Sequence, residues 1–138
     1  MDNVLDMQDL RYLNLFNKVT KISTRYCFNY NNTVIFFVPK ALIRRALGEE
    51  GRNIKYIGEV LKRRIKIFPI PHGTEDAQRF IELLVNPVQF KKLEINPNEI
   101  IVTAGMQSKA ALIGRDKRRL VEMQKIIRGF FGRDFKVA

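Results

Sequence analysis

The sequence predicts an α+β fold in which one unit, helix-strand-strand-helix-helix-strand, occurs twice and forms a three-stranded sheet each time. Three observations support this prediction. The chain aligns with itself after a shift of 66 residues, helical and strand-like periodicities alternate along it, and each copy carries a glycine loop between two helical segments. Because these features recur in the same order, the repeat organises the whole chain.

The internal repeat runs without a gap from residue 32 to residue 63. The matching positions comprise a strand-like run, a glycine and an apolar helix face: residues 34–36 with 100–102, Gly48 with Gly114, and Ile54, Ile57, Val60 and Leu61 with Leu120, Met123, Ile126 and Ile127. Two unrelated amphipathic segments would match in one of these features. Agreement in all three at one shift favours a true repeat.

The first copy begins with a helix over residues 6–20, whose apolar positions recur every three residues: Leu10, Leu13, Phe16 and Val19. Alternating side chains then predict strands over residues 24–30 and 34–38, and the Asn31-Asn32 pair between them predicts a hairpin turn. The aromatic residues of these strands are expected in the core: Phe28, Phe36 and Phe37.

Two helices, over residues 40–47 and 53–64, then flank a loop that glycine both opens and closes, Gly48-Glu49-Glu50-Gly51. A strand over residues 65–70 completes the first copy. The last helix of the copy carries an apolar stripe, which is expected in the core. Tyr56 lies off this stripe, which predicts an exposed ring that either stacks on a base or faces solvent.

The second copy repeats this order. Thr74 is the expected N-cap of its first helix, and Glu75 and Asp76 suit the positive end of the helix dipole. The apolar stripe of this helix consists of Ala77, Phe80, Ile81, Leu84 and Val85. Strands over residues 88–95 and 99–104 follow, joined by an Asn-Pro-Asn turn.

Helices over residues 107–113 and 118–128 flank the second loop, Gly114-Arg115-Asp116-Lys117, and a strand over residues 135–137 closes the copy. Between the copies, residues 71–73 interrupt the pattern with Pro, His and Gly. We therefore expect two domains, 1–70 and 71–138.

The balance of charge predicts a polyanionic partner. The 138 residues include 25 Lys and Arg against 14 Asp and Glu, for a formal net charge of +11 and a sequence pI near 10.1. Both predicted domains are cationic, since 13 basic and 6 acidic residues give +7 for the first, and 12 and 8 give +4 for the second. A basic face of this strength is typical of nucleic-acid-binding proteins.

Composition also excludes several classes. The longest apolar run, residues 34–38, is too short to cross a bilayer, and the acidic start is unlike a signal peptide, so we expect a cytoplasmic protein without a membrane partner. Cys27 is the lone cysteine and His72 the lone histidine, which leaves no internal disulfide and no zinc-binding set. We expect no metal and no cofactor.

The glycine loops carry the features of an anion-binding site. Gly48 and Gly51 have no side chain, so the backbone between them can approach a ligand closely. The next helix begins at the loop, where its N–H groups and dipole favour an anion, and Arg52 and Lys55 add charge within one turn. Phosphate is the expected ligand.

The motif around the first loop, ALGEEGRNIKYI, resembles the signature of KH domains, and LIGRDKRRLVEM resembles a degenerate second copy. The predicted order of elements is that of the prokaryotic, type II KH fold. Two such domains in tandem over nearly the whole chain resemble the archaeal NusA-like transcription elongation and termination factors.

This resemblance implies binding of single-stranded RNA, in which the loop holds about four nucleotides and an adjacent apolar groove receives bases. It also suggests RNA polymerase as a partner. The residues that match the motif and are expected to bind RNA are Gly48, Glu49, Glu50, Gly51, Arg52 and Lys55 in the first copy, and Gly114, Arg115, Asp116, Lys117, Arg118 and Arg119 in the second.

The two loops depart from the KH pattern in different ways. Glu49 and Glu50 stand where the pattern usually has a basic or small residue, and like charges 4 Å apart repel by about 1 kcal/mol in water. In the second copy Lys117 replaces the closing glycine, which limits close approach of the backbone but adds charge beside Arg115 and Arg118. We therefore expect the second loop to contribute more phosphate affinity.

Other functions were weighed against RNA binding in transcription. An enzyme is not expected, because the sequence has no nucleophile elbow, no P-loop and no carboxylate pair near a histidine, and so no catalytic residue. KH pairs also occur in ribosome- and exosome-associated proteins, so ribosome assembly or RNA processing stays an alternative. A protein-interaction scaffold with weakened RNA binding is a further alternative. The sequence does not determine the oligomeric state, and we favour a monomer.

Overall fold

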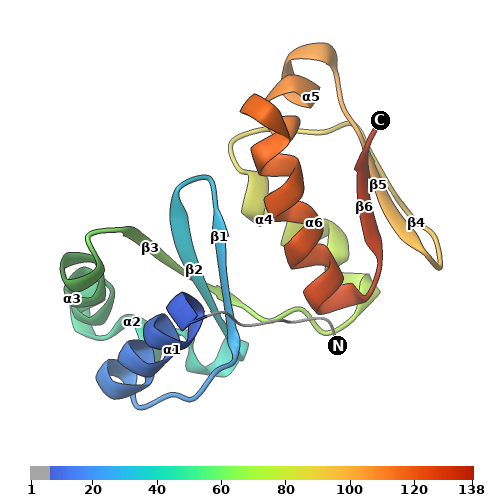
Figure 1. Cartoon of the computed structure of the whole chain (residues 1–138). Helices are drawn as coiled ribbons and strands as arrows, with labels where there is room; N and C mark the ends of the chain where they lie inside the picture. The colour runs from blue at the N-terminus through green and yellow to red at the C-terminus, as the bar shows by residue number, and fades with distance from the viewer. Residues whose placement is uncertain (1–6) are drawn as a thin grey trace. The chain divides into compact units, whose positions relative to one another are not determined.

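The computed structural model describes residues 7–138, and its helices and strands follow the predicted order in both halves of the chain (Figure 1). The described residues divide into two compact units, called here the first unit (residues 7–70) and the second unit (Pro71–Ala138). Each has helices and one three-stranded sheet, which confirms the α+β class. Asp6 of the predicted first helix and the acidic start of the chain lie outside the described residues.

The first unit consists of α1 (Met7–Thr20), β1 (Tyr26–Tyr30), β2 (Thr33–Val38), α2 (Ile43–Leu47), α3 (Arg52–Leu61) and β3 (Arg64–Pro69). Short 3₁₀ turns, Lys40–Leu42 and Glu49–Gly51, precede α2 and α3. Asn31 and Asn32 both have positive φ, as a tight hairpin turn requires, and β1 pairs antiparallel with β2. The helical crossover then places β3 parallel to β2.

The core of the first unit lies between its helices and β2. Phe16 of α1 stacks on Phe36 of β2 with ring centroids 4.4 Å apart, and both side chains are fully buried. Ile57 of α3 belongs to the same buried cluster. Phe28 and Phe37 are also buried, which confirms the three predicted core aromatics of this unit. The predicted apolar stripes are only partly buried, since Leu10 of α1 and Val60 of α3 are 44% and 48% exposed. Because one side of α3 is buried, its other side, which carries Arg52, Lys55 and Tyr56, faces solvent.

The second unit consists of α4 (Ala77–Val85), β4 (Lys92–Ile95), β5 (Glu99–Thr103), α5 (Met106–Ile113), α6 (Arg118–Phe131) and β6 (Asp134–Val137). Its sheet repeats the first, with β4 antiparallel and β6 parallel to the central β5. The core is built on α6, where Met123, Ile126 and Ile127 are buried as predicted, together with Ile100 of β5 and Phe135 of β6.

Two predicted boundaries in the second unit are wrong. Thr74 is not an N-cap, because a 3₁₀ turn (Thr74–Asp76) begins directly after Gly73 and takes Thr74 into the turn, whereas an N-cap residue needs a non-helical backbone. Asp76 precedes α4 instead, and its Oδ2 accepts the backbone N–H of His72 at 2.8 Å. The strand predicted over residues 88–95 keeps only Lys92–Ile95, the four residues that pair in register with β5.

The repeat changes its spacing at the last helix. α3 has 10 residues and α6 has 14, so Arg64 pairs with Thr33 in the first sheet while Asp134 pairs with Glu99 in the second. Four residues make about one helical turn, so α6 is about one turn longer than α3. Even so, no helix within residues 7–138 is long and apolar enough to cross a membrane.

Candidate nucleic-acid interface

The two glycine loops have the same backbone conformation. Gly48 and Gly114 have φ/ψ of 77°/170° and 76°/170°. The third loop residues, Glu50 and Asp116, lie at 54°/30° and 55°/28°. The closing residues, Gly51 and Lys117, lie at 72°/19° and 61°/20°. The two loops therefore have different residues but follow the same backbone path.

The opening glycine is required by this conformation. The combination of positive φ with extended ψ at Gly48 is accessible essentially to glycine alone. A Cβ atom there would lie 2.8 Å from Cγ of Asn53, and a Cβ on Gly114 would lie 3.0 Å from Cβ of Arg119. Both contacts are shorter than ordinary packing allows, so neither position has room for a side chain.

The closing position is more tolerant than the sequence suggested. A Cβ on Gly51 would meet Cγ2 of Ile54 at 3.7 Å, an ordinary contact. Lys117 adopts the same left-handed conformation at a cost of roughly 1–2 kcal/mol for a residue with a Cβ. Lys117 therefore leaves the backbone path of the loop unchanged, and its effect on a ligand comes from the side chain.

Hydrogen bonds within each loop decide which N–H groups face a ligand. Gly51 N–H donates to the carbonyl of Gly48 and Lys117 N–H to that of Gly114, both at 3.1 Å. The first N–H groups of α3 and α6 are also used inside the turns, where Arg52 donates to the carbonyl of Glu49 and Arg118 to that of Arg115. In a 3₁₀ turn the preceding N–H groups, at positions 49–50 and 115–116, are the ones available to an external anion. The donors thus lie earlier in the loop than the sequence predicted.

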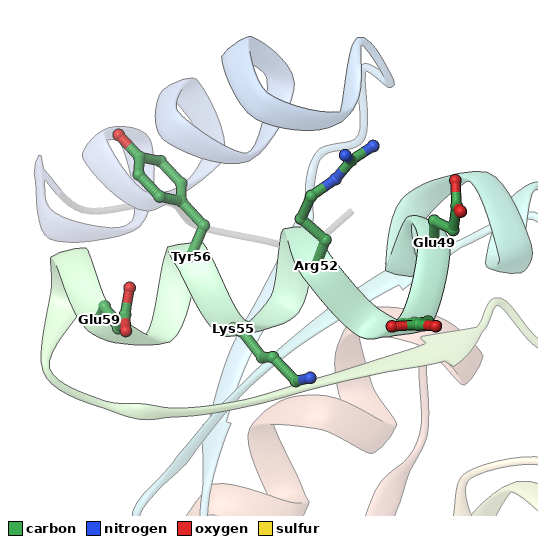
Figure 2. Close-up of a pocket in the computed structure, with 6 residues that line it drawn as sticks. Glu49, Arg52, Lys55, Tyr56 and Glu59 are labelled. Atoms are coloured by element: carbon green, nitrogen blue, oxygen red, sulfur yellow. The ribbon is translucent and has the colours of Figure 1, made fainter.

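Beside the first loop, a shallow groove of about 480 Å³ runs along α3. Its lining residues are Glu49, Glu50, Arg52, Lys55, Tyr56 and Glu59 (Figure 2). Arg52 and Tyr56 project from one side of α3 and Lys55 from another. Tyr56 is 51% exposed, which confirms the predicted exposed ring. Three carboxylates and two cations line this groove, so it is a poor site for phosphate on charge grounds.

The second loop presents mostly positive charge. Arg115, Lys117 and Arg118 are exposed around the start of α6, with Asp116 as the one acidic residue of the loop. Arg119, which was also expected to bind RNA, is half-buried and donates from Nη1 to the carbonyl of Ala111 at 3.3 Å. The structure therefore brings three of the four predicted cations to the surface and turns the fourth toward α5.

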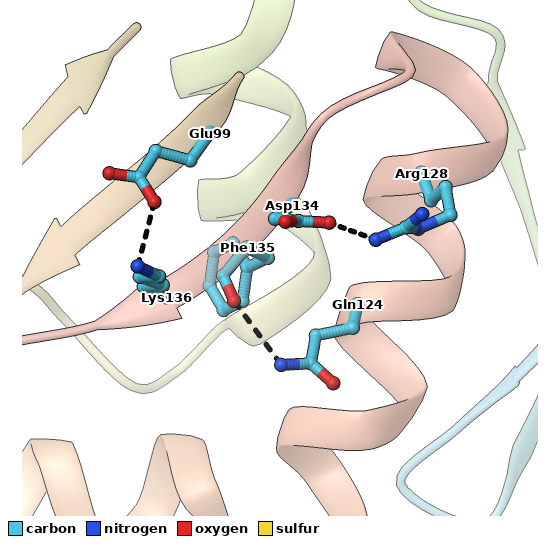
Figure 3. A network of polar contacts seen from close by, with 6 residues as sticks. All are labelled: Glu99, Gln124, Arg128, Asp134, Phe135 and Lys136. Carbon is cyan, nitrogen blue, oxygen red and sulfur yellow. Dashed lines mark hydrogen bonds and ion pairs between the residues drawn. The ribbon is translucent and has the colours of Figure 1, made fainter.

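A second groove, of about 470 Å³, lies between α6 and β6. It is lined by Gln124, Lys125, Arg128, Asp134, Phe135 and Lys136, most of which Figure 3 shows in a polar network. Arg128 pairs with Asp134, and Gln124 Nε2 donates to the carbonyl of Phe135 at 3.4 Å. Sequence reasoning missed this groove, because it forms only when β6 lies beside the longer α6.

Lys136 in this groove is held by a surface ion pair. Its Nζ lies 2.9 Å from Oε1 of Glu99, on the neighbouring strand β5. The hydrogen bond to Glu99, and then the charge of that carboxylate, raise the pKa of Lys136 above its ordinary value of 10.5. Lys136 therefore stays charged throughout the neutral range.

The structure offers no candidate metal centre among residues 7–138, where no group of three or more His, Cys, Asp or Glu side chains lies close enough to hold an ion. The loops offer backbone N–H groups, and the second loop adds exposed cationic side chains, an arrangement suited to an anion.

Comparison with known proteins is informative for the fold. No protein-family model matches the chain. No curated protein matches it either. Among solved structures, the chain is similar to the "Crystal structure of APE1850", with a TM-score of 0.63 and 24% sequence identity over 96% of this chain and 99% of that chain. At this level of identity the match shows a shared fold that extends over nearly the whole chain.

Proposed function

We propose that the chain consists of two type II KH domains in tandem and binds single-stranded RNA without catalysis, chiefly through its second loop. The observation that carries this proposal is the pair of loops with one backbone conformation, each placed between two helices and opened by a glycine that tolerates no side chain. The order of helices and strands is the one that the KH resemblance implies. A turn that offers N–H groups at a helix start is suited to a nucleic-acid phosphate.

The second loop is proposed as the stronger phosphate site because of its charge. Arg115, Lys117 and Arg118 surround it, whereas Glu49 and Glu50 occupy the interior of the first loop. Exposed charges are screened, yet several cations around one phosphate path add measurable affinity through counterion release. The α6–β6 groove adds Lys125 in the same unit, whereas its Arg128 and Lys136 are already paired with Asp134 and Glu99.

The biological role that the KH resemblance favours is transcription elongation or termination in the cytoplasm, alongside RNA polymerase. Binding of ribosomal RNA during ribosome assembly or RNA processing would use the same loops. The acidic groove on α3 favours a second candidate, in which the first unit contacts a protein and binds RNA weakly.

The test is a fluorescence-anisotropy titration of a short mixed-sequence single-stranded RNA at two salt concentrations, with duplex RNA as competitor. The proposal predicts tight binding that weakens as salt rises and that duplex RNA competes for poorly. Equal competition by duplex RNA would reduce the interaction to general attraction between a polycation and a polyanion. Absence of binding at low salt would favour the protein-interaction candidate.

A further inference from the structure

In both units, a side chain from the first turn of the helix that follows the loop, α3 or α6, crosses the loop and bonds to the helix before it, α2 or α5. Asn53 Nδ2 donates to the carbonyls of Arg45 at 3.3 Å and of Ala46 at 3.2 Å. Arg119 Nη1 donates to the carbonyl of Ala111 at 3.3 Å. Asn53 and Arg119 occupy matching positions in the repeat, and so do Arg45 and Ala111. An amide and a guanidinium thus make the same connection.

This connection passes directly over the opening glycine. The atoms nearest to a Cβ built on Gly48 belong to Asn53, and those nearest to a Cβ built on Gly114 belong to Arg119. The side chain and the glycine are therefore complementary, since the absent Cβ provides the space through which the side chain runs. The carbonyls that it reaches belong to the last turn of α2 or α5, where helix carbonyls need partners from outside the helix.

The closing residue does not account for the shared loop conformation, because it is glycine in the first loop and lysine in the second. A left-handed Lys117 persists only where surrounding contacts hold it. The features common to both loops are the opening glycine and the side chain that ties the second helix to the first.

We infer that Asn53 and Arg119 are positioning residues, which hold each loop in its anion-binding conformation without themselves contacting RNA. The inference rests on the proposed function. Two neighbouring arginines then have different roles in RNA binding. Arg118 attracts RNA by its charge, whereas Arg119 holds the loop through its hydrogen bond to α5. Loss of the charge of Arg119 is therefore tolerated when the replacing side chain can still donate to the carbonyl of Ala111.

The repeat supplies the test variant, since the first unit already uses Asn at this position on the same backbone. Arg119→Asn keeps the connection and removes the charge, Arg119→Ala removes both, and Arg118→Asn is the matched loss of charge on an exposed neighbour. Each variant of the full chain is titrated with the single-stranded RNA over a range of salt concentrations.

We expect Arg119→Ala to lower RNA affinity about tenfold and Arg119→Asn to restore most of it, both with a wild-type salt dependence. Arg118→Asn is expected to reduce the slope of log affinity against log salt by about 0.7, the value for one lost phosphate contact on a single strand. Equal losses for Arg119→Asn and Arg118→Asn, with the same reduced slope, would make Arg119 a direct RNA ligand and overturn the inference.

A second measurement separates this inference from the proposed function and from simple unfolding. Amide NMR spectra and hydrogen exchange of the free protein report on the loop in the absence of RNA. Arg119→Ala is expected to shift the Lys117 amide and accelerate its exchange while residues of β5 keep their protection, and Arg119→Asn is expected to leave both near wild type. A wild-type loop spectrum in Arg119→Ala would overturn the inference even if RNA binds. If the wild-type protein fails to bind RNA, the proposed function fails and the spectra still decide the positioning role.

Discussion

The two loops differ at every position after the first glycine, yet their backbone angles agree within about ten degrees. The loop conformation therefore does not depend on the charge of the loop residues, as a comparison of two sequences shows: Gly48-Glu49-Glu50-Gly51 and Gly114-Arg115-Asp116-Lys117. The shape follows from the opening glycine and from the side chain that crosses it. The charge follows from the loop interior, which is free to vary because its side chains point to solvent.

The comparison also shows that the charge of a unit does not predict the charge of its loop. The first unit lies in the half of the chain with the larger positive charge, but its loop and the adjoining groove contain Glu49, Glu50 and Glu59. The second half is less cationic, but its loop is surrounded by arginine and lysine. A phosphate responds to the charges within a Debye length of about 10 Å, so the local distribution decides where it binds.

The largest expected effect comes from the residue that both loops share. Gly48→Ala and Gly114→Ala each place a Cβ against the crossing side chain, in a region of φ/ψ that only glycine adopts. We expect a loss of about 3 kcal/mol in the stability of the altered unit, measured by hydrogen exchange resolved for each unit. Gly132→Ala is the control, because its Cβ meets open space and only the positive φ costs energy, about 1 kcal/mol. Equal effects at all three glycines would show that the crossing side chain does not constrain the loop.

Charge reversal at the second loop should give the next largest effect. Arg115→Asp/Lys117→Asp is expected to lower the affinity for single-stranded RNA more than tenfold at low salt and to reduce the salt slope by about 1.4. The same measurement on Arg79→Asp/Lys91→Asp, a charge-matched change at exposed positions of the same unit, is the control. Unchanged affinity of the loop variant would refute the dominance of the second loop.

Exchanging the closing residues of the two loops tests shape and charge separately. Lys117→Gly relieves a left-handed lysine and is expected to stabilise the second unit by about 1 kcal/mol while weakening RNA binding. Gly51→Lys is expected to destabilise the first unit and to strengthen RNA binding, since the Cβ has room at this position. Urea unfolding and RNA titration of both variants measure the two effects separately. A Gly51→Lys variant that fails to fold would contradict the tolerance inferred for this position.

The smallest expected effect concerns the ion pair on the second sheet. Glu99 raises the pKa of Lys136, so the folded state holds this proton more tightly than the unfolded state does. The resulting stabilisation is present below pH 10.5 and is lost as pH rises through the raised pKa. Glu99→Gln is expected to return the pKa of Lys136 toward 10.5 and to remove this pH dependence. An NMR titration of the lysine side chains checks this, and an unchanged Lys136 pKa would contradict it.

Local features of this protein could be predicted from neighbouring residues in the sequence. Helical and strand periodicity, the Asn31-Asn32 turn and the two glycine loops depend on neighbouring residues, which is why the order of elements and the α+β class were predictable. The exposure of Tyr56 and the burial of Ile57 follow from the same periodicity, because residues on one face of a helix share one environment.

Where those segments end, and which groups their side chains contact, depends on packing between distant parts of the chain. Lys125 and Arg128 of α6 line one groove with Lys136 of β6, an arrangement of distant segments that no local pattern specifies. In the sequence, Arg119 is one of several cations in a basic run. Its hydrogen bond to the carbonyl of Ala111 on α5 depends on the folded loop and could not be predicted. The direction of a side chain depends on the space that the backbone leaves for it. At Gly114 the side chain of Arg119 has this space because glycine has no Cβ.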